Sequence, residues 1–173
     1  MKVFQSQKFA ASYRLFLTSS MKIYLDTNAF FKYFRDEPGS LVVRRLISDN
    51  EIYVSAFTCL EFVGVLAQNV RMKKLKKTMM RRIVKRMRYE IGSSNSHKTF
   101  TVLETPQAAF REAQSILLQH GITRTIGSGD ALHIGIVVRH RDMNLTIVTS
   151  DQGFKHVCSA MAIPVFDPEK DSL

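Results

Sequence analysis

Four acidic residues, far apart in the chain, are the strongest candidates for chemistry: Asp26, Glu61, Asp130 and Asp151. An unpaired buried carboxylate is very costly, so several carboxylates at one place must share protons or hold a cation. Carboxylate oxygens are the ligands that hard divalent ions such as Mg²⁺ and Mn²⁺ prefer. If the fold gathers these acids, we therefore expect a divalent-metal site.

Local sequence places three of the acids at one edge of a sheet. Asp26 ends a strand-like run that begins at Lys22, and Asp151 follows a second run that begins at Leu145. Asp130 opens an apolar helix after a glycine-rich turn. Because ligands bind outside the carboxyl ends of the strands in parallel sheets, we expect these three side chains to converge.

Glu61 is carried by a helix whose N-cap is Ser55. Phe57 and Val65 lie one turn to either side of Glu61, so this acid shares their apolar stripe. We therefore expect its carboxylate on a buried face of the helix, where it needs a partner.

Each acid also has a simpler explanation. Asp130 after Gly129 is a common helix-start residue, and Asp151 before Gln152-Gly153 could belong to a turn. His133, one helical turn beyond Asp130, fits a packed or surface histidine better than a ligand. Four independent coincidences are less economical than one site, so the set favours the metal-site interpretation.

Short apolar strands alternate with helices, which predicts an α/β/α sandwich with a central, mostly parallel sheet of four to five strands. The expected strands cover residues 22–25, 51–54, 99–103, 145–149 and 163–166. The expected helices cover 28–34, 40–48, a segment starting at Ser55, a basic segment at 71–88, 106–121 and 130–140. We expect one domain over residues 21–173.

The net charge of +10 is concentrated in residues 71–88, which hold ten Lys/Arg and no acid. The rest of the chain has 25 − 10 = 15 basic residues against 15 acidic ones. We expect this helix to contact nucleic acid or an acidic partner through Arg71, Lys73, Lys74, Lys76, Lys77, Arg81, Arg82, Lys85, Arg86 and Arg88. The apolar residues at spacings of three or four predict one packed face: Met72, Leu75, Met79, Ile83 and Met87. Two alternatives for this basic helix are a face that is merely solvated and a face that binds a membrane surface. The apolar side of the helix has no Trp or Phe, which argues against the membrane.

The rest of the composition fits a folded protein in a reducing cytoplasm. The chain is 45% hydrophobic, and none of its apolar runs approaches membrane-spanning length. Cys59 and Cys158 lack metal-ligand spacing, which favours reduced thiols. Residues 1–20 contain no acid and form a leader or tail, and their composition also matches an organelle-targeting peptide. Met21 begins like a natural protein start, so we expect these residues to be a tail or an over-long start.

The sequence resembles the PIN-domain nucleases, above all the VapC-type toxins of toxin–antitoxin pairs. The matching pieces span roughly residues 21–166: Leu25-Asp26-Thr27-Asn28, Ser55 with Glu61, Asp130-Ala131-Leu132-His133-Ile134 and Thr149-Ser150-Asp151. The resemblance implies a PIN-like fold and a metal-dependent endoribonuclease, with the four acids around one or two Mg²⁺ or Mn²⁺ ions. It implies that Asn28 and Thr149 support the acids by hydrogen bonds and that cleavage leaves a 5′-phosphate and a 3′-hydroxyl. An antitoxin partner and a homodimer are further implications.

Two other functions stay open. A non-catalytic RNA- or partner-binding module on the same fold would explain the basic segment, but it gives no reason for four retained carboxylates. An aspartyl phosphohydrolase with Asp26 as nucleophile usually has a second aspartate two residues on, where Asn28 stands.

Overall fold

The computed structural model describes residues 20–92 and 99–171. Its helices and strands follow in the order β1 (Lys22–Leu25), α2 (Thr27–Phe34), α3 (Ser40–Asp49), β2 (Glu51–Ser55), α4 (Ala56–Arg71), α5 (Lys77–Ile91), β3 (Thr101–Leu103), α6 (Gln107–His120), α7 (Ser128–Arg139), the 3-10 helix η1 (Arg141–Met143), β4 (Thr146–Val148), α8 (Gln152–Ala160) and β5 (Val165–Phe166). The expected leader lies almost entirely outside the described residues, and its role stays a prediction.

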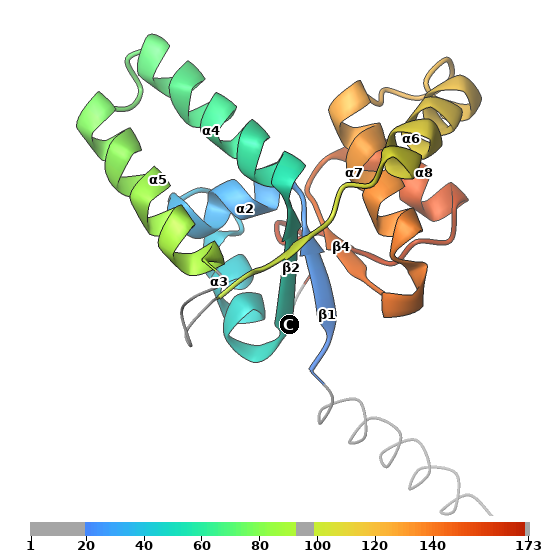
Figure 1. Cartoon of the computed structure of the whole chain (residues 1–173), viewed down its shortest axis with the longest axis horizontal. Helices are drawn as coiled ribbons and strands as arrows, with labels where there is room; N and C mark the ends of the chain where they lie inside the picture. Colours follow the sequence, from blue (N-terminus) through green and yellow to red (C-terminus); the bar gives the residue numbers. More distant parts are fainter. Residues whose placement is uncertain (1–19, 93–98, 172–173) are drawn as a thin grey trace, which may run out of the picture.

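The strands form one parallel sheet in the order β3-β2-β1-β4-β5. Figure 1 shows α2–α5 on one side of this sheet and α6–α8 on the other. The predicted α/β/α sandwich with a parallel sheet is therefore confirmed. The chain winds outward in one direction through β2 and β3 and in the other through β4 and β5, so the switch point lies at the β1–β4 pair.

Alternate residues of the central strands pack into two separate cores. Tyr24 and Ile147 belong to the core beneath α6–α8, whereas Ile23 and Val148 belong to the core beneath α2–α5. Both faces of the sheet are thus buried, which explains why these strands are apolar runs rather than alternating ones.

The prediction that the basic segment at residues 71–88 forms a single helix is wrong. The α4 helix ends at Arg71, a turn follows, and α5 begins at Lys77. Lys73 lies in this turn with a left-handed backbone (φ 59°), a conformation that glycine usually supplies. Because neither glycine nor proline marks the break, the sequence pattern did not reveal it.

The break also changes which apolar residues are buried. Leu75, Ile83 and Met87 are buried as predicted, but Met72 and Met79 are exposed. Met72 precedes the break and no longer belongs to the face of α5, so the prediction of five packed residues is wrong for these two.

One helix was not predicted. α8 follows directly after Asp151, at a position where the sequence also allowed a simple turn. Cys59 and Cys158 are free thiols, as expected. Within the described ranges, the helices are too short or too polar to cross a membrane.

Candidate active site

Two of the four acids leave the sheet side by side, because β1 and β4 are neighbouring parallel strands with Leu25 opposite Val148. Asp26 caps α2, and its Oδ1 accepts a hydrogen bond from the Ala29 amide at 2.6 Å. Asp151 caps α8, and its Oδ1 accepts from the Phe154 amide at 2.7 Å. The carboxyl ends of adjacent strands thus position both side chains, as the topology argument predicted.

Asp130 is the third residue of α7 rather than its first. Its Oδ2 accepts a hydrogen bond from the Gly127 amide at 3.1 Å and so closes the first turn of the helix. This helix N-terminus faces the same edge of the sheet as the two strand-end acids.

Glu61 is half-buried, with 32% of its side chain exposed, and not on a fully buried face as predicted. Its Oε2 accepts a hydrogen bond from the Thr27 hydroxyl at 2.6 Å and lies 2.9 Å from His133 Nε2. An ideal Cβ on Gly129 would lie 2.6 Å from Glu61 Oε1, so a larger residue at that position would have to displace the Glu61 carboxylate.

All four acids line a single cavity of about 560 Å³. Asn28 and His133 also line it, but lysine and arginine are absent from the described residues of its lining. Among the described residues, Asp26, Asp130 and Asp151 form no ion pair with a lysine or arginine. The predicted convergence is therefore present, and its negative charge is not neutralised by basic side chains of the described ranges.

The pKa values of these acids reflect their burial first and the neighbouring charges second. Asp26 is only 5% exposed, and burial raises its pKa to about 6 despite hydrogen bonds from Ala29 and Thr149. Burial also raises the pKa of Asp130, and the nearby charges of Asp151 and Glu61 add to the effect. Burial alone would raise the pKa of Glu61, but hydrogen bonds from His133 and Thr27 outweigh it and lower that pKa.

A divalent cation fits this donor set, because it would stabilise the charged form of carboxylates that are buried and close to one another. However, no three His, Cys, Asp or Glu side chains in the described ranges converge closely enough to form a ready-made metal site. Asp26, Asp130 and Asp151 each have one oxygen held by a backbone amide.

A buried hydrogen-bond network connects the site to the interior of the protein. His133 is 2% exposed, and its Nδ1 lies 2.7 Å from the Tyr24 hydroxyl. The same hydroxyl lies 3.0 Å from Ser55 Oγ and 3.2 Å from Thr58 Oγ1. His133 thus connects the interior of the sheet to Glu61, a positioning role that sequence reasoning missed. The available signal was its spacing of one helical turn from Asp130.

Thr149 and Asn28, the two residues predicted to support the acids, make different contacts. The Thr149 hydroxyl accepts a hydrogen bond from the Asp151 amide at 3.1 Å, and it also lowers the pKa of Asp26. Asn28 lines the cavity, but within the described chain its side chain makes no hydrogen bond to the four acids.

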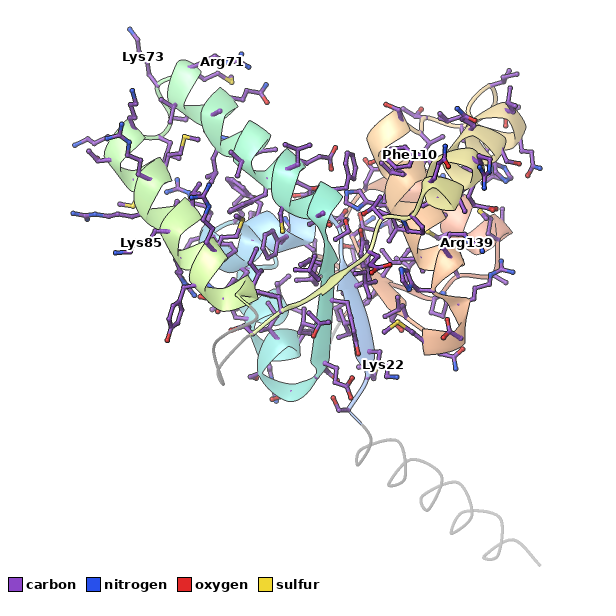
Figure 2. All side chains as sticks on the ribbon, in the orientation of Figure 1. Lys22, Arg71, Lys73, Lys85, Phe110 and Arg139 are labelled. Carbon is purple, nitrogen blue, oxygen red and sulfur yellow. The ribbon has the colours of Figure 1, made fainter. Side chains whose placement is uncertain are left out.

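The ten basic residues of segment 71–88 do not line this cavity. Figure 2 shows Arg71 and Lys73 at the tip of the α4–α5 hairpin and Lys85 along α5. Arg86 serves the fold itself: its Nε bonds Glu90 Oε1 at 2.6 Å, and its guanidinium lies 4.8 Å from the centre of the Tyr33 ring. We therefore regard Arg86 as an anchor of α5, while the other nine basic residues stay predicted contacts.

The model of the PIN domain family matches residues 23–160, which include all four acids. This chain belongs to the PIN domain family. Solved structures share the fold of this PIN protein. FitAcB from Neisseria gonorrhoeae is 24% identical, with coverage of 86% of this chain and 99% of that chain and a TM-score of 0.60. VapBC2 from Rickettsia felis, bound to promoter DNA, is 18% identical. The match covers 85% of this chain and 98% of that chain and has a TM-score of 0.58.

A third similar structure is VapC20 from Mycobacterium tuberculosis, described as a sarcin-ricin loop cleaving toxin. It is 14% identical, covers 78% of this chain and 93% of that chain, and has a TM-score of 0.57. No curated protein sequence matches the chain. The family model thus shows membership of the PIN domain family, and the solved structures show the shared fold.

Proposed function

We propose that this PIN protein is a metal-dependent endoribonuclease and the toxin of a toxin–antitoxin pair. The observation that carries the proposal is the cavity lined by Asp26, Glu61, Asp130 and Asp151, without a lysine or arginine among the described side chains of its lining. Such a cavity repels a phosphate unless a cation is present, so the acids make chemical sense only with a metal ion.

Asp26, Asp130 and Asp151 would hold Mg²⁺ or Mn²⁺, and Glu61 would hold a second ion or orient water. When bound, the ion lowers the pKa of water and neutralises charge on the phosphate. The protein contributes positioning: the Thr149 hydroxyl supports Asp26 and the Asp151 backbone. Thr27 and His133 together fix one oxygen of Glu61 and leave its Oε1 outside these contacts.

Similar structures support the substrate and the partner. VapC20 is described as cleaving the sarcin-ricin loop, and FitAB and VapBC were solved as complexes bound to DNA. We accordingly propose an RNA substrate, a cognate antitoxin, and a cytoplasmic location, with the basic α4–α5 hairpin attracting the polyanion. A homodimer rests on the resemblance alone.

Cleavage of RNA in Mn²⁺ or Mg²⁺ tests this function. We expect Asp26→Asn to lower the cleavage rate by at least about a hundredfold, because a metal ligand and its charge are removed. Chelator should abolish the wild-type rate. Asp142→Asn is the matched control, since Asp142 is exposed on η1, away from the cavity lining. Cleavage that survives both chelator and Asp26→Asn would refute the proposal.

The non-catalytic binding module makes a different prediction. It requires no metal at the four acids, so Mn²⁺ titration would show no binding at millimolar concentration. Saturable Mn²⁺ binding that disappears in Asp26→Asn favours the nuclease.

A further inference from the structure

A second cavity, of about 550 Å³, adjoins the acid cavity and shares Asn28 and Asp151 with it. Its remaining lining residues come from the α6–α7 loop, the start of α8 and the C-terminal segment: Thr125, Ser150, Gln152, Gly153, His156 and Glu169. A ligand bound at the acids would therefore lie next to this space.

The walls of the second cavity are fixed by close contacts. An ideal Cβ on Gly153 would lie 1.7 Å from the Thr125 carbonyl oxygen, so the α6–α7 loop packs directly on the first turn of α8. Arg124 Nη1 donates a hydrogen bond to the His156 carbonyl at 2.9 Å and ties the same loop to the same helix.

Glu169 is held as a charged acceptor. Its Oε1 accepts a 2.6 Å bond from Lys32, which is itself buried, and its amide donates to Asp167 Oδ1 at 3.0 Å. The bond from Lys32 holds the pKa of Glu169 below its ordinary value. The carboxylate is thus a permanent feature of the wall and not a group that swings freely in solvent.

Gln152 is also oriented. In the amide orientation that satisfies its neighbours, its side-chain oxygen accepts from Lys155 at 2.7 Å and Lys170 at 2.9 Å. Its amide nitrogen takes no part in these two bonds, so its N–H donors are available to a ligand. The cavity therefore presents fixed acceptors, at least one donor and the imidazole of His156.

Charge decides which part of a nucleotide suits this cavity. The described residues of its lining include two carboxylates, Asp151 and Glu169, and neither lysine nor arginine. Lys32 pairs with Glu169, and Lys155 and Lys170 contact the Gln152 side-chain oxygen. The carboxylate oxygens outside these contacts suit a neutral base that donates N–H groups. Carboxylates accept hydrogen bonds from base amino groups, and unstacked RNA bases are read on their edges while stacked on aromatic or imidazole rings.

We propose that this cavity is a nucleobase subsite beside the scissile phosphate, selective for bases with an exocyclic amino group. Glu169 accepts from the amino group, Gln152 donates to a ring nitrogen or carbonyl, and His156 offers a stacking surface. Adenine, guanine and cytosine carry such an amino group, whereas uracil can donate only its ring N3–H, so uracil is bound more weakly at this position. The subsite rests on the proposed ribonuclease function.

Sequencing of the sites cut in a random RNA pool tests the subsite. We expect the wild type to avoid uridine at one position flanking the cut by about tenfold, the discrimination typical of one good base contact. Glu169→Gln and His156→Ala should each reduce this avoidance to below about threefold. Asp142→Asn should keep the wild-type pattern, because it makes the same carboxylate-to-amide change at an exposed site outside the cavity.

The outcomes separate the subsite from the nuclease itself. Wild-type cleavage with no base preference at either flank, or with a preference retained in both variants, overturns the subsite alone. If the wild type cuts no RNA, the nuclease proposal fails, and anisotropy titrations with oligocytidine and oligouridine then decide: equal affinities overturn the subsite. If Glu169→Gln does not fold because Lys32 is left without its carboxylate, His156→Ala decides, since this side chain is exposed on α8.

Discussion

Asp26 shows what a buried acid costs in this protein. Its pKa is 3.8 in an unperturbed chain and about 6 in the fold, because burial disfavours the charged form. Between these values the folded protein binds more protons than the unfolded one, so its stability falls as the pH rises from about 4 to about 6. Above about pH 6 the full free-energy cost of burying the charged carboxylate is present, of the order of 3 kcal/mol.

Replacing this carboxylate should therefore stabilise the metal-free protein. We expect Asp26→Asn to raise the free energy of unfolding by roughly 1–3 kcal/mol at pH 7.5, with the gain vanishing near pH 4. Asparagine keeps the N-cap of α2, so the helix start is preserved. Urea denaturation in chelator at both pH values measures the difference, with Asp142→Asn as control. If the Asp26→Asn variant is less stable than the wild type at pH 7.5, burial is not the dominant cause of the raised pKa.

At the scale of elements, the site depends on how closely α7 packs against its neighbours. An ideal Cβ on Gly135 would lie 2.5 Å from the Ala109 carbonyl oxygen, so α7 and α6 touch backbone to backbone. Because α7 carries Asp130 and His133, this close packing helps to set their distance from the sheet. Gly64 on α4, by contrast, has nothing within 4 Å of its ideal Cβ.

The same substitution at Gly135 and Gly64 tests this close packing. We expect Gly135→Ala to lower the free energy of unfolding by about 2 kcal/mol, because the added methyl group forces the helices apart. Gly64→Ala should raise it by about 0.5–1 kcal/mol, since alanine favours an open helical position. Thermal or urea denaturation of both variants measures the changes. If both substitutions stabilise the protein, the close approach of α6 and α7 is wrong.

Among the described residues, the acid cavity and the lysine-rich tip of the α4–α5 hairpin lie apart. The acids line the cavity at the carboxyl edge of the sheet, whereas Arg71 and Lys73 lie at the tip of the α4–α5 hairpin (Figure 2). A distant basic surface can attract a long polyanion without neutralising the acids. Under the proposed function, the hairpin would capture RNA and the cavity would carry out the chemistry.

Neutralising the hairpin tip should weaken RNA binding. With Lys73, Lys74, Lys76 and Lys77 changed to glutamine, we expect a higher KM and a weaker salt dependence of binding, by about 0.7 in the logarithmic slope for each phosphate that is no longer neutralised. The control variant changes four exposed basic residues elsewhere: Lys22, Arg111, Arg139 and Arg141. Equal weakening in the two variants would mean that net charge matters and the position of the hairpin does not.

Local rules were sufficient for the parts of this protein that depend on near neighbours in the chain. The strand at residues 22–25 and the Ser55 cap were predicted correctly, because short apolar runs and capping residues act over a few positions. The convergence of Asp26 and Asp151 was also predictable, since the ends of parallel strands share one edge of the sheet. Glycine and proline did not mark the turn at Lys73, and so the sequence concealed the division of the basic segment.

The sequence by itself determined the parallel sheet and the edge at which Asp26 and Asp151 meet, because these follow from periodicity and chain direction. Only the tertiary structure decided that His133 and Thr27 hold Glu61, that Arg86 is bound by Glu90, and that a second cavity continues from the first. The Glu61–His133 interaction joins residues 72 positions apart. Its distance depends on how α4 and α7 pack across the sheet edge, and no local pattern encodes that packing.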